Sequence, residues 1–105
     1  MNRVFVTGIG FASSIGTGRD EVLASLKELR HGFVRKQLAG DGVGPDLVCG
    51  EVGGFDVSSP EARDWSFPGS GDLEPGFLRG LPPHGPYAFV ALEEALHMAG
   101  LEGVD

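Results

Sequence analysis

The chain begins with an apolar run, Val4-Phe5-Val6, that carries β-branched and aromatic side chains on consecutive positions. Consecutive apolar positions are typical of a strand that is covered on both faces in a parallel or mixed sheet. Glycines follow at positions 8, 10 and 16, before a helical pattern begins. The start of the sequence therefore predicts a buried strand that leads through a glycine-rich turn into a helix.

The predicted helix lies between Asp20 and Gly32. Asp20 and Glu21 place negative charge in the first turn, where the helix dipole favours it. Arg30, His31 and Gly32 suit the C-terminal end of a helix. Apolar residues at positions i, i+1, i+4 and i+7 predict one buried stripe, made of Val22, Leu23, Leu26 and Leu29.

Residues 33–47 contain three glycines and Pro45, so we expect an exposed connection there. A second strand is predicted from about Leu47 to Val52. Strand, helix and strand in this order give a βαβ outline, and the fold class is therefore predicted as α/β.

The segment from Asp56 to Pro83 contains five prolines and no sustained period of two or 3.6 residues. Segments this long without regular structure are usually either functional or disordered, and the sequence leaves both options open. Trp65 and Phe67 lie inside it; they either anchor the segment on the core or belong to a contact surface.

A final helix is predicted from Pro86 or Tyr87 to Ala99. Its expected buried face is narrow and made mostly of small side chains, which permits close packing; the residues are Ala88, Ala91, Leu92, Ala95 and Ala99. Gly100 can adopt the left-handed conformation that ends a helix, and Leu101 can make the apolar contact that follows it.

Composition narrows the classes of function. Of 105 residues, 18 are glycine and 7 are proline, which predicts a loop-rich chain. The formal net charge of −7 opposes phosphate binding, so nucleic acid is not an expected partner. A single cysteine excludes an internal disulfide framework and suits the cytoplasm. No apolar run approaches the ~20 residues that a membrane-spanning helix needs, so no membrane association is expected.

Three blocks of sequence occur in an order that is characteristic of one family. The first runs from Arg3 to Gly16 and contains Thr7-Gly8-Ile9-Gly10; the second is Val48-Cys49-Gly50-Glu51-Val52 with Phe55-Asp56; the third is the alanine-rich stretch from Pro86 to Leu101. Together they resemble the N-terminal end of the β-ketoacyl-acyl-carrier-protein synthases. These are thiolase-fold condensing enzymes of fatty-acid and polyketide synthesis.

The resemblance implies a layered α/β fold, of which residues 1–105 would form an incomplete N-terminal part, with a Pro/Gly-rich loop segment at about 56–83. The chain then looks truncated. A complete member is an acyltransferase that condenses an acyl-thioester with malonyl-carrier protein by decarboxylation, and works as a homodimer or heterodimer. Its expected partners are acyl carrier protein and acyl-thioester substrates.

The family's catalytic cysteine and two histidines would lie beyond residue 105, so no catalytic, cofactor-binding or metal-binding residue is assigned to this chain. We expect it to be inactive alone, with no cofactor. A second hypothesis is a vestigial or interaction module that resembles the non-catalytic chain-length-factor partners of these synthases. A cysteine in a small-residue turn downstream, followed by two histidines, would distinguish the first hypothesis from the second.

The first glycine cluster also allows a Rossmann-type NAD(P)-binding interpretation, in which glycine amides approach a pyrophosphate at a helix N-terminus. The spacing fits poorly, because Ser13 stands where the third glycine belongs and Gly16 is too distant. In the family interpretation, these glycines serve a turn and close packing.

Two other groups of residues could in principle form a catalytic or a metal site. Cys49 lies inside a predicted strand without a histidine close in sequence, so we expect a buried structural thiol rather than a nucleophile. Glu93, Glu94 and His97 have the spacing of metal ligands on one helix face. Because no other helix supplies matching ligands, we expect that face to be solvated.

The region after the second strand carries an unfavourable charge for carrier-protein docking. Family members often present basic residues there to an acidic carrier protein. In this chain the stretch from Asp56 to Pro75 holds five acidic residues, Asp56, Glu61, Asp64, Asp72 and Glu74, against Arg63 alone. We therefore expect no docking of an acidic carrier protein on this stretch.

Overall fold

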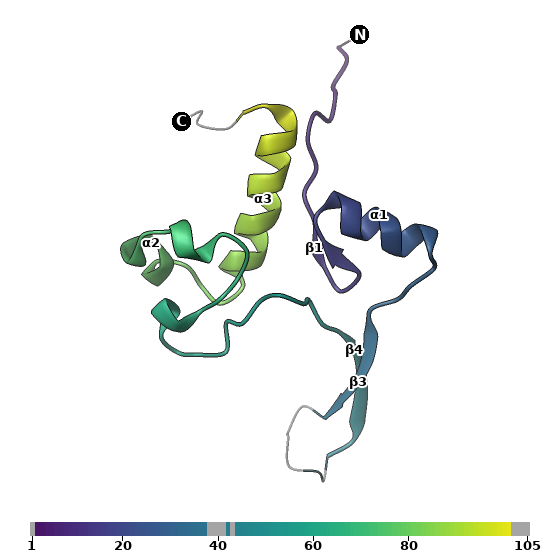
Figure 1. The fold of residues 1–105 in the computed structure, drawn as a ribbon, viewed down its shortest axis with the longest axis vertical. Helices are drawn as coiled ribbons and strands as arrows, with labels where there is room; N and C mark the ends of the chain where they lie inside the picture. Colours follow the sequence, from purple (N-terminus) through teal and green to yellow (C-terminus); the bar gives the residue numbers. More distant parts are fainter. Residues whose placement is uncertain (1, 38–41, 43, 102–105) are drawn as a thin grey trace.

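The computed structural model describes residues 2–37, 42 and 44–101, and it contains both helices and strands (Figure 1). The elements in chain order are β1 (Ala12–Ser13), β2 (Gly16–Thr17), α1 (Arg19–Lys27), β3 (Phe33–Gln37), β4 (Asp46–Gly50), the 3-10 helices η1 (Ala62–Asp64) and η2 (Ser70–Asp72), α2 (Pro75–Arg79) and α3 (Gly85–Ala99). The prediction of a mixed helix and strand chain is confirmed.

The described strands form two separate antiparallel sheets of two strands each, β1 with β2 and β3 with β4. In the larger one, Phe33 pairs with Gly50 and Gln37 with Asp46, and the hairpin projects away from the rest of the chain (Figure 1). The second strand was predicted correctly, although it ends at Gly50. The βαβ outline was wrong, because residues 4–6 form no strand and β4 pairs antiparallel with β3. The exposed connection predicted at residues 33–47 was wrong for residues 33–37, which are β3.

The predicted strand at Val4-Phe5-Val6 is not formed. Residues 2–11 have no regular secondary structure, and they run beside α3 (Figure 1). Val4 is 93% exposed, Phe5 74% and Val6 86%, so the expected burial on both faces is also wrong. A strand is defined by hydrogen bonds to a neighbour, and the described residues place no strand beside this segment.

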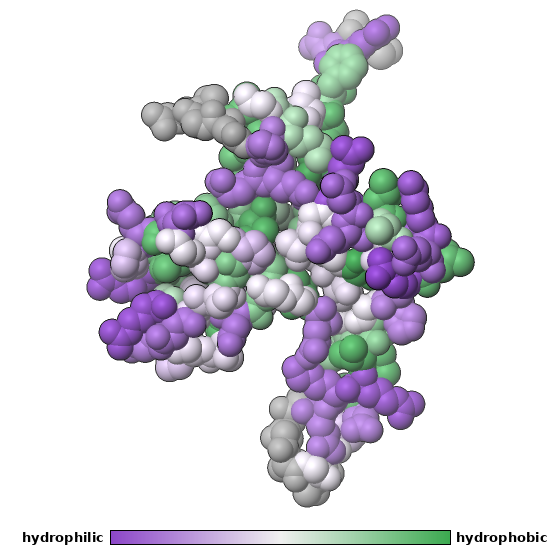
Figure 2. All heavy atoms as spheres, viewed as in Figure 1, coloured by the Kyte–Doolittle hydropathy of each residue, from purple (hydrophilic) through white to green (hydrophobic). Residues whose placement is uncertain are grey.

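Helix α1 is shorter and less buried than predicted. It ends at Lys27, and Leu29 follows with a left-handed φ of 57°, so Arg30, His31 and Gly32 lie beyond the helix. Of the expected stripe, only Val22 is buried, while Leu23, Leu26 and Leu29 are exposed. Figure 2 shows the resulting apolar surface at the side of the molecule where α1 lies.

The principal hydrophobic core lies in the segment that had no predicted structure. Trp65, Phe67 and Leu78 are buried together. The partly buried residues around them come from the same segment, from α3 and from the position just before the segment: Phe55, Val57, Ala62, Leu73, Leu81, Phe89 and Val90. Trp65 Nε1 donates a hydrogen bond to the Ser59 carbonyl oxygen at 2.8 Å. Of the two options for Trp65 and Phe67, the structure supports a role as core anchors.

A turn stabilised by Asp56 begins this folded segment. The Asp56 backbone pairs with Ser66, and its Oδ1 accepts hydrogen bonds from Ser58 Oγ at 2.7 Å and from the Ser58 amide at 3.2 Å. These bonds, the side-chain one first, lower the pKa of Asp56 below its ordinary value. The contribution of this turn to stability is therefore present at neutral pH and is lost as the pH falls through the lowered pKa.

Helix α3 matches its prediction closely. It starts at Gly85, one residue before the expected start, and its first-turn Pro86 is buried. Gly100 has φ 73°, as predicted. Its amide donates to the His97 carbonyl oxygen at 3.1 Å, and the Leu101 amide donates to the Leu96 carbonyl oxygen at 2.9 Å, which closes the helix end.

The chain is less compact than a globular domain of the same size. Its accessible surface is 7981 Å², whereas a compact monomer of this mass exposes about 5,600 Å². Its radius of gyration is 16.7 Å, against about 13 Å for a compact domain of this length. Much of the apolar surface therefore remains uncovered.

Candidate functional site

The glycine-rich turn between residues 7 and 18 is held by hydrogen bonds from its backbone amides to two carboxylates. The Phe11 amide donates to Glu94 Oε1 at 2.9 Å, and the Arg19 amide donates to Glu94 Oε2 at 2.7 Å. The Thr17 amide donates to Glu21 Oε2 at 2.6 Å. Two carboxylates thus satisfy backbone amides on either side of Gly18, which has φ 95° and immediately precedes α1.

Gly8 and Gly10 lie directly against α3. A Cβ atom on Gly8 would collide with the Ala95 carbonyl oxygen, and one on Gly10 with the Ala91 carbonyl oxygen. Ala91 and Ala95 are partly buried, as expected for the small-residue face, although Ala88 and Leu92 are exposed. The prediction that these glycines allow close packing is confirmed.

The same geometry argues against a pyrophosphate site at this turn. Gly8 and Gly10 face helix carbonyl groups, which repel phosphate oxygens, rather than an open space. At the N-terminus of α1, where a phosphate would sit, the Arg19 amide is already bonded to the Glu94 carboxylate. The Glu94 carboxylate therefore occupies the position that a bound phosphate would take.

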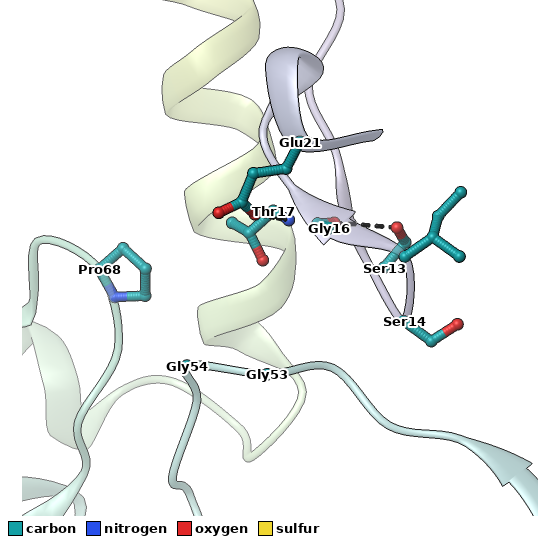
Figure 3. Close-up of a pocket in the computed structure, with 9 residues that line it drawn as sticks. Ser13, Ser14, Gly16, Thr17, Glu21, Gly53, Gly54 and Pro68 are labelled. Atoms are coloured by element: carbon teal, nitrogen blue, oxygen red, sulfur yellow. Dashed lines mark hydrogen bonds between the residues drawn. The ribbon is translucent and has the colours of Figure 1, made fainter. Parts of the chain in front are cut away.

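A cavity of about 420 Å³ lies beside the turn (Figure 3). Its walls are Ser13, Ser14, Ile15, Gly16, Thr17, Glu21, Gly53, Gly54 and Pro68. Figure 3 shows the hydrogen bond that Ser13 Oγ donates to the Gly16 carbonyl oxygen, at 2.9 Å. The walls hold three hydroxyl groups and one carboxylate, and that carboxylate, Glu21, accepts a hydrogen bond from the Thr17 amide. No histidine or lysine is among the described lining residues, so none of these hydroxyl groups has an imidazole or amine base to activate it for acyl transfer.

A larger cavity of about 650 Å³ lies between the hairpin and the start of α3. Lys36 and Glu51 form an ion pair at its wall. The hydrogen bond and charge of Glu51 raise the pKa of Lys36 above its ordinary value, so this lysine is held in its charged form. A charged lysine is a poor base, so it would not activate the hydroxyl groups of Ser14 and Tyr87, which also line this cavity.

Cys49 lies on β4 opposite Val34. It is a free thiol and only half-buried, so the prediction of full burial was wrong. In the part of the chain that the structure describes, β4 pairs with β3 alone, so no further strand extends this sheet. Its assignment as a structural rather than catalytic cysteine stays a prediction.

The three residues with metal-ligand spacing on α3, Glu93, Glu94 and His97, lie in different environments. Glu93 and His97 are exposed, as expected for a solvated face. Glu94 is turned inward to the Phe11 and Arg19 amides, so the prediction was wrong for this residue. Within the described part of the chain, no group of three or more histidine, cysteine, aspartate or glutamate side chains could hold a metal ion.

Sequence reasoning missed Glu94 because its two partners lie 83 and 75 positions away. No local spacing signals such a contact.

The five acidic residues from Asp56 to Pro75 are all exposed. The prediction that an acidic carrier protein does not dock on this stretch stays a prediction. No helix in the described ranges is long and apolar enough to cross a membrane.

Similarity to known proteins agrees with the three sequence blocks. The chain is 33% identical over 101 residues, or 96% of its length, to 3-oxoacyl-[acyl-carrier-protein] synthase 1 of Escherichia coli K12, and equally to the protein of the same name in E. coli O6:H1. Over nearly its whole length the chain is thus similar to β-ketoacyl-acyl-carrier-protein synthases. The resemblance predicted from sequence is therefore confirmed.

The match covers 22% of each synthase, so this chain spans about a fifth of the length of these relatives. No family model matches the chain. No solved structure matches it either, so the thiolase-like architecture stays a prediction from the sequence resemblance.

Proposed function

We propose that this chain supplies the N-terminal part of a β-ketoacyl synthase fold and carries no condensing chemistry of its own. The observation that supports this most strongly is the identity to two synthases over 96% of the chain. In the complete fold, an acyl-thioester would be condensed with malonyl-carrier protein, in fatty-acid or polyketide synthesis. Acyl carrier protein would be the partner, and a dimer the working state.

The open structure supports a role as part of a larger body. The surface of 7981 Å² exceeds the value for a compact monomer by about 2,400 Å². The segment around Val4, Phe5 and Val6 is apolar, extended and unpaired in the described chain, which suits a strand whose neighbours come from elsewhere in the sheet.

The proposal is tested by replacing the matched segment of E. coli K12 3-oxoacyl-[acyl-carrier-protein] synthase 1 with this chain. The chimera is expected to be soluble and to take up label from labelled acyl-acyl-carrier protein. The isolated 105-residue chain is expected to take up none. Cys49→Ser should change neither result, because the nucleophile would come from the host.

Two results would contradict this proposal. One is labelling of the isolated wild-type chain that the Cys49→Ser variant loses, which would make Cys49 a nucleophile. The other is an insoluble or unlabelled chimera beside a soluble, labelled host prepared in parallel.

A further inference from the structure

The two halves of the chain differ in how they are held together. The Trp65 cluster draws its described members from residues 55–90 and includes none from residues 2–32. Residues 2–32 bury only Val22 as a hydrophobic side chain and Ser25 as a polar one. We call these residues the N-terminal unit. Its attachment to α3 therefore rests on few contacts.

In the described chain, two kinds of contact contribute to that attachment. Gly8 and Gly10 lie against the backbone of α3 at Ala95 and Ala91, which adds close packing but no side-chain area. Glu94 adds two hydrogen bonds from one carboxylate, to the amides of Phe11 and Arg19. Because these bonds end on two different segments, the single carboxylate fixes both the position of the turn and the start of α1.

The other charged groups near this point do not replace Glu94. Glu21 bonds the Thr17 amide, so it acts inside the N-terminal unit. The exposed Arg19 and Asp20 belong to the first turn of α1. The neighbouring Glu93 is exposed. Loss of Glu94 would leave the partly buried Phe11 amide without its acceptor, which is unfavourable.

We propose that Glu94 is a latch that couples the N-terminal unit to α3, and that releasing it lets this unit open while the Trp65 cluster stays folded. This is a local opening of the kind seen when one region of a protein has few buried contacts. The latch is a property of this chain alone, and it holds whether or not the synthase proposal is correct.

The test is peptide-resolved amide hydrogen exchange on the full chain, comparing wild type with Glu94→Ala, Glu94→Gln and Glu93→Gln. In Glu94→Ala, exchange in residues 2–32 should rise at least about tenfold, the size expected when charge-assisted hydrogen bonds are lost. Exchange in residues 55–101 should not change. Glu94→Gln should be intermediate, because its amide keeps one acceptor oxygen, and Glu93→Gln should match wild type.

The proposal is overturned if Glu94→Ala exchanges like Glu93→Gln, because the Glu94 carboxylate would then not stabilise the attachment of the N-terminal unit to α3. It is also overturned if both regions lose protection together in Glu94→Ala and in the milder Glu94→Gln, because the chain would then open as one unit. Trp65 fluorescence, followed in the same samples, reports independently on whether the cluster remains packed.

Discussion

Replacing Trp65 with alanine is expected to lower the free energy of unfolding by about 3–5 kcal/mol, the usual effect of deleting a buried aromatic side chain. Trp65 is 8% exposed, lies at the centre of the cluster with Phe67 and Leu78, and its indole nitrogen bonds the Ser59 carbonyl oxygen. Small domains have a total free energy of unfolding of about 5–15 kcal/mol, so this variant should lose a large part of its stability. Urea unfolding followed by far-ultraviolet circular dichroism measures the change.

Phe5→Ala is the matched control for the Trp65 variant. Phe5 is also aromatic, but it is 74% exposed, so its removal should change the unfolding midpoint little. If Phe5→Ala were as destabilising as Trp65→Ala, the core would lie at the N-terminal segment rather than around Trp65.

Gly10→Ala is expected to destabilise the chain by about 1–3 kcal/mol, the typical effect of forcing a methyl group into a packed contact. The new Cβ would overlap the Ala91 carbonyl oxygen, and a helix backbone cannot move aside as a flexible side chain could. The N-terminal segment would have to lift from α3. The same urea titration detects the change.

Gly76→Ala provides the comparison for Gly10→Ala. Gly76 lies in α2, and a Cβ there would meet open space. Alanine is also the better helix former, so this variant should be neutral or slightly stabilised. Equal destabilisation by both substitutions would refute the packing role of Gly10.

The sequence was most informative where the determinants of structure are local. Helix α3 was predicted almost to the residue, because Pro86 and Gly100 mark its two ends. Strand β4 was found for a similar reason, since its apolar run is bounded by turn residues. Its partner β3 was missed, because the glycines at positions 40, 42 and 44 predict a connection, and that prediction extended back over residues 33–37.

The features that could not be predicted from the sequence depend on contacts between residues far apart in the chain. The core around Trp65 and Phe67 has no period, because it is built from turns and short helices rather than from one long element. The segment around Phe5 has the composition of a strand but no neighbour in the described chain to pair with. In the candidate site, the packing of Gly8 and Gly10 could be anticipated from their type, whereas the position of Glu94 could not.

The claim that this chain is part of a larger fold is tested most directly by measuring its association state in isolation. Size-exclusion chromatography over a range of concentrations, with thermal unfolding of the same samples, is sufficient. Val4, Phe5, Val6, Leu23 and Leu26 are exposed, and apolar patches of this kind promote association. The account predicts oligomers that grow with concentration. A monodisperse monomer at every concentration, with a cooperative melt, would instead show that 105 residues close their own core as an independent domain.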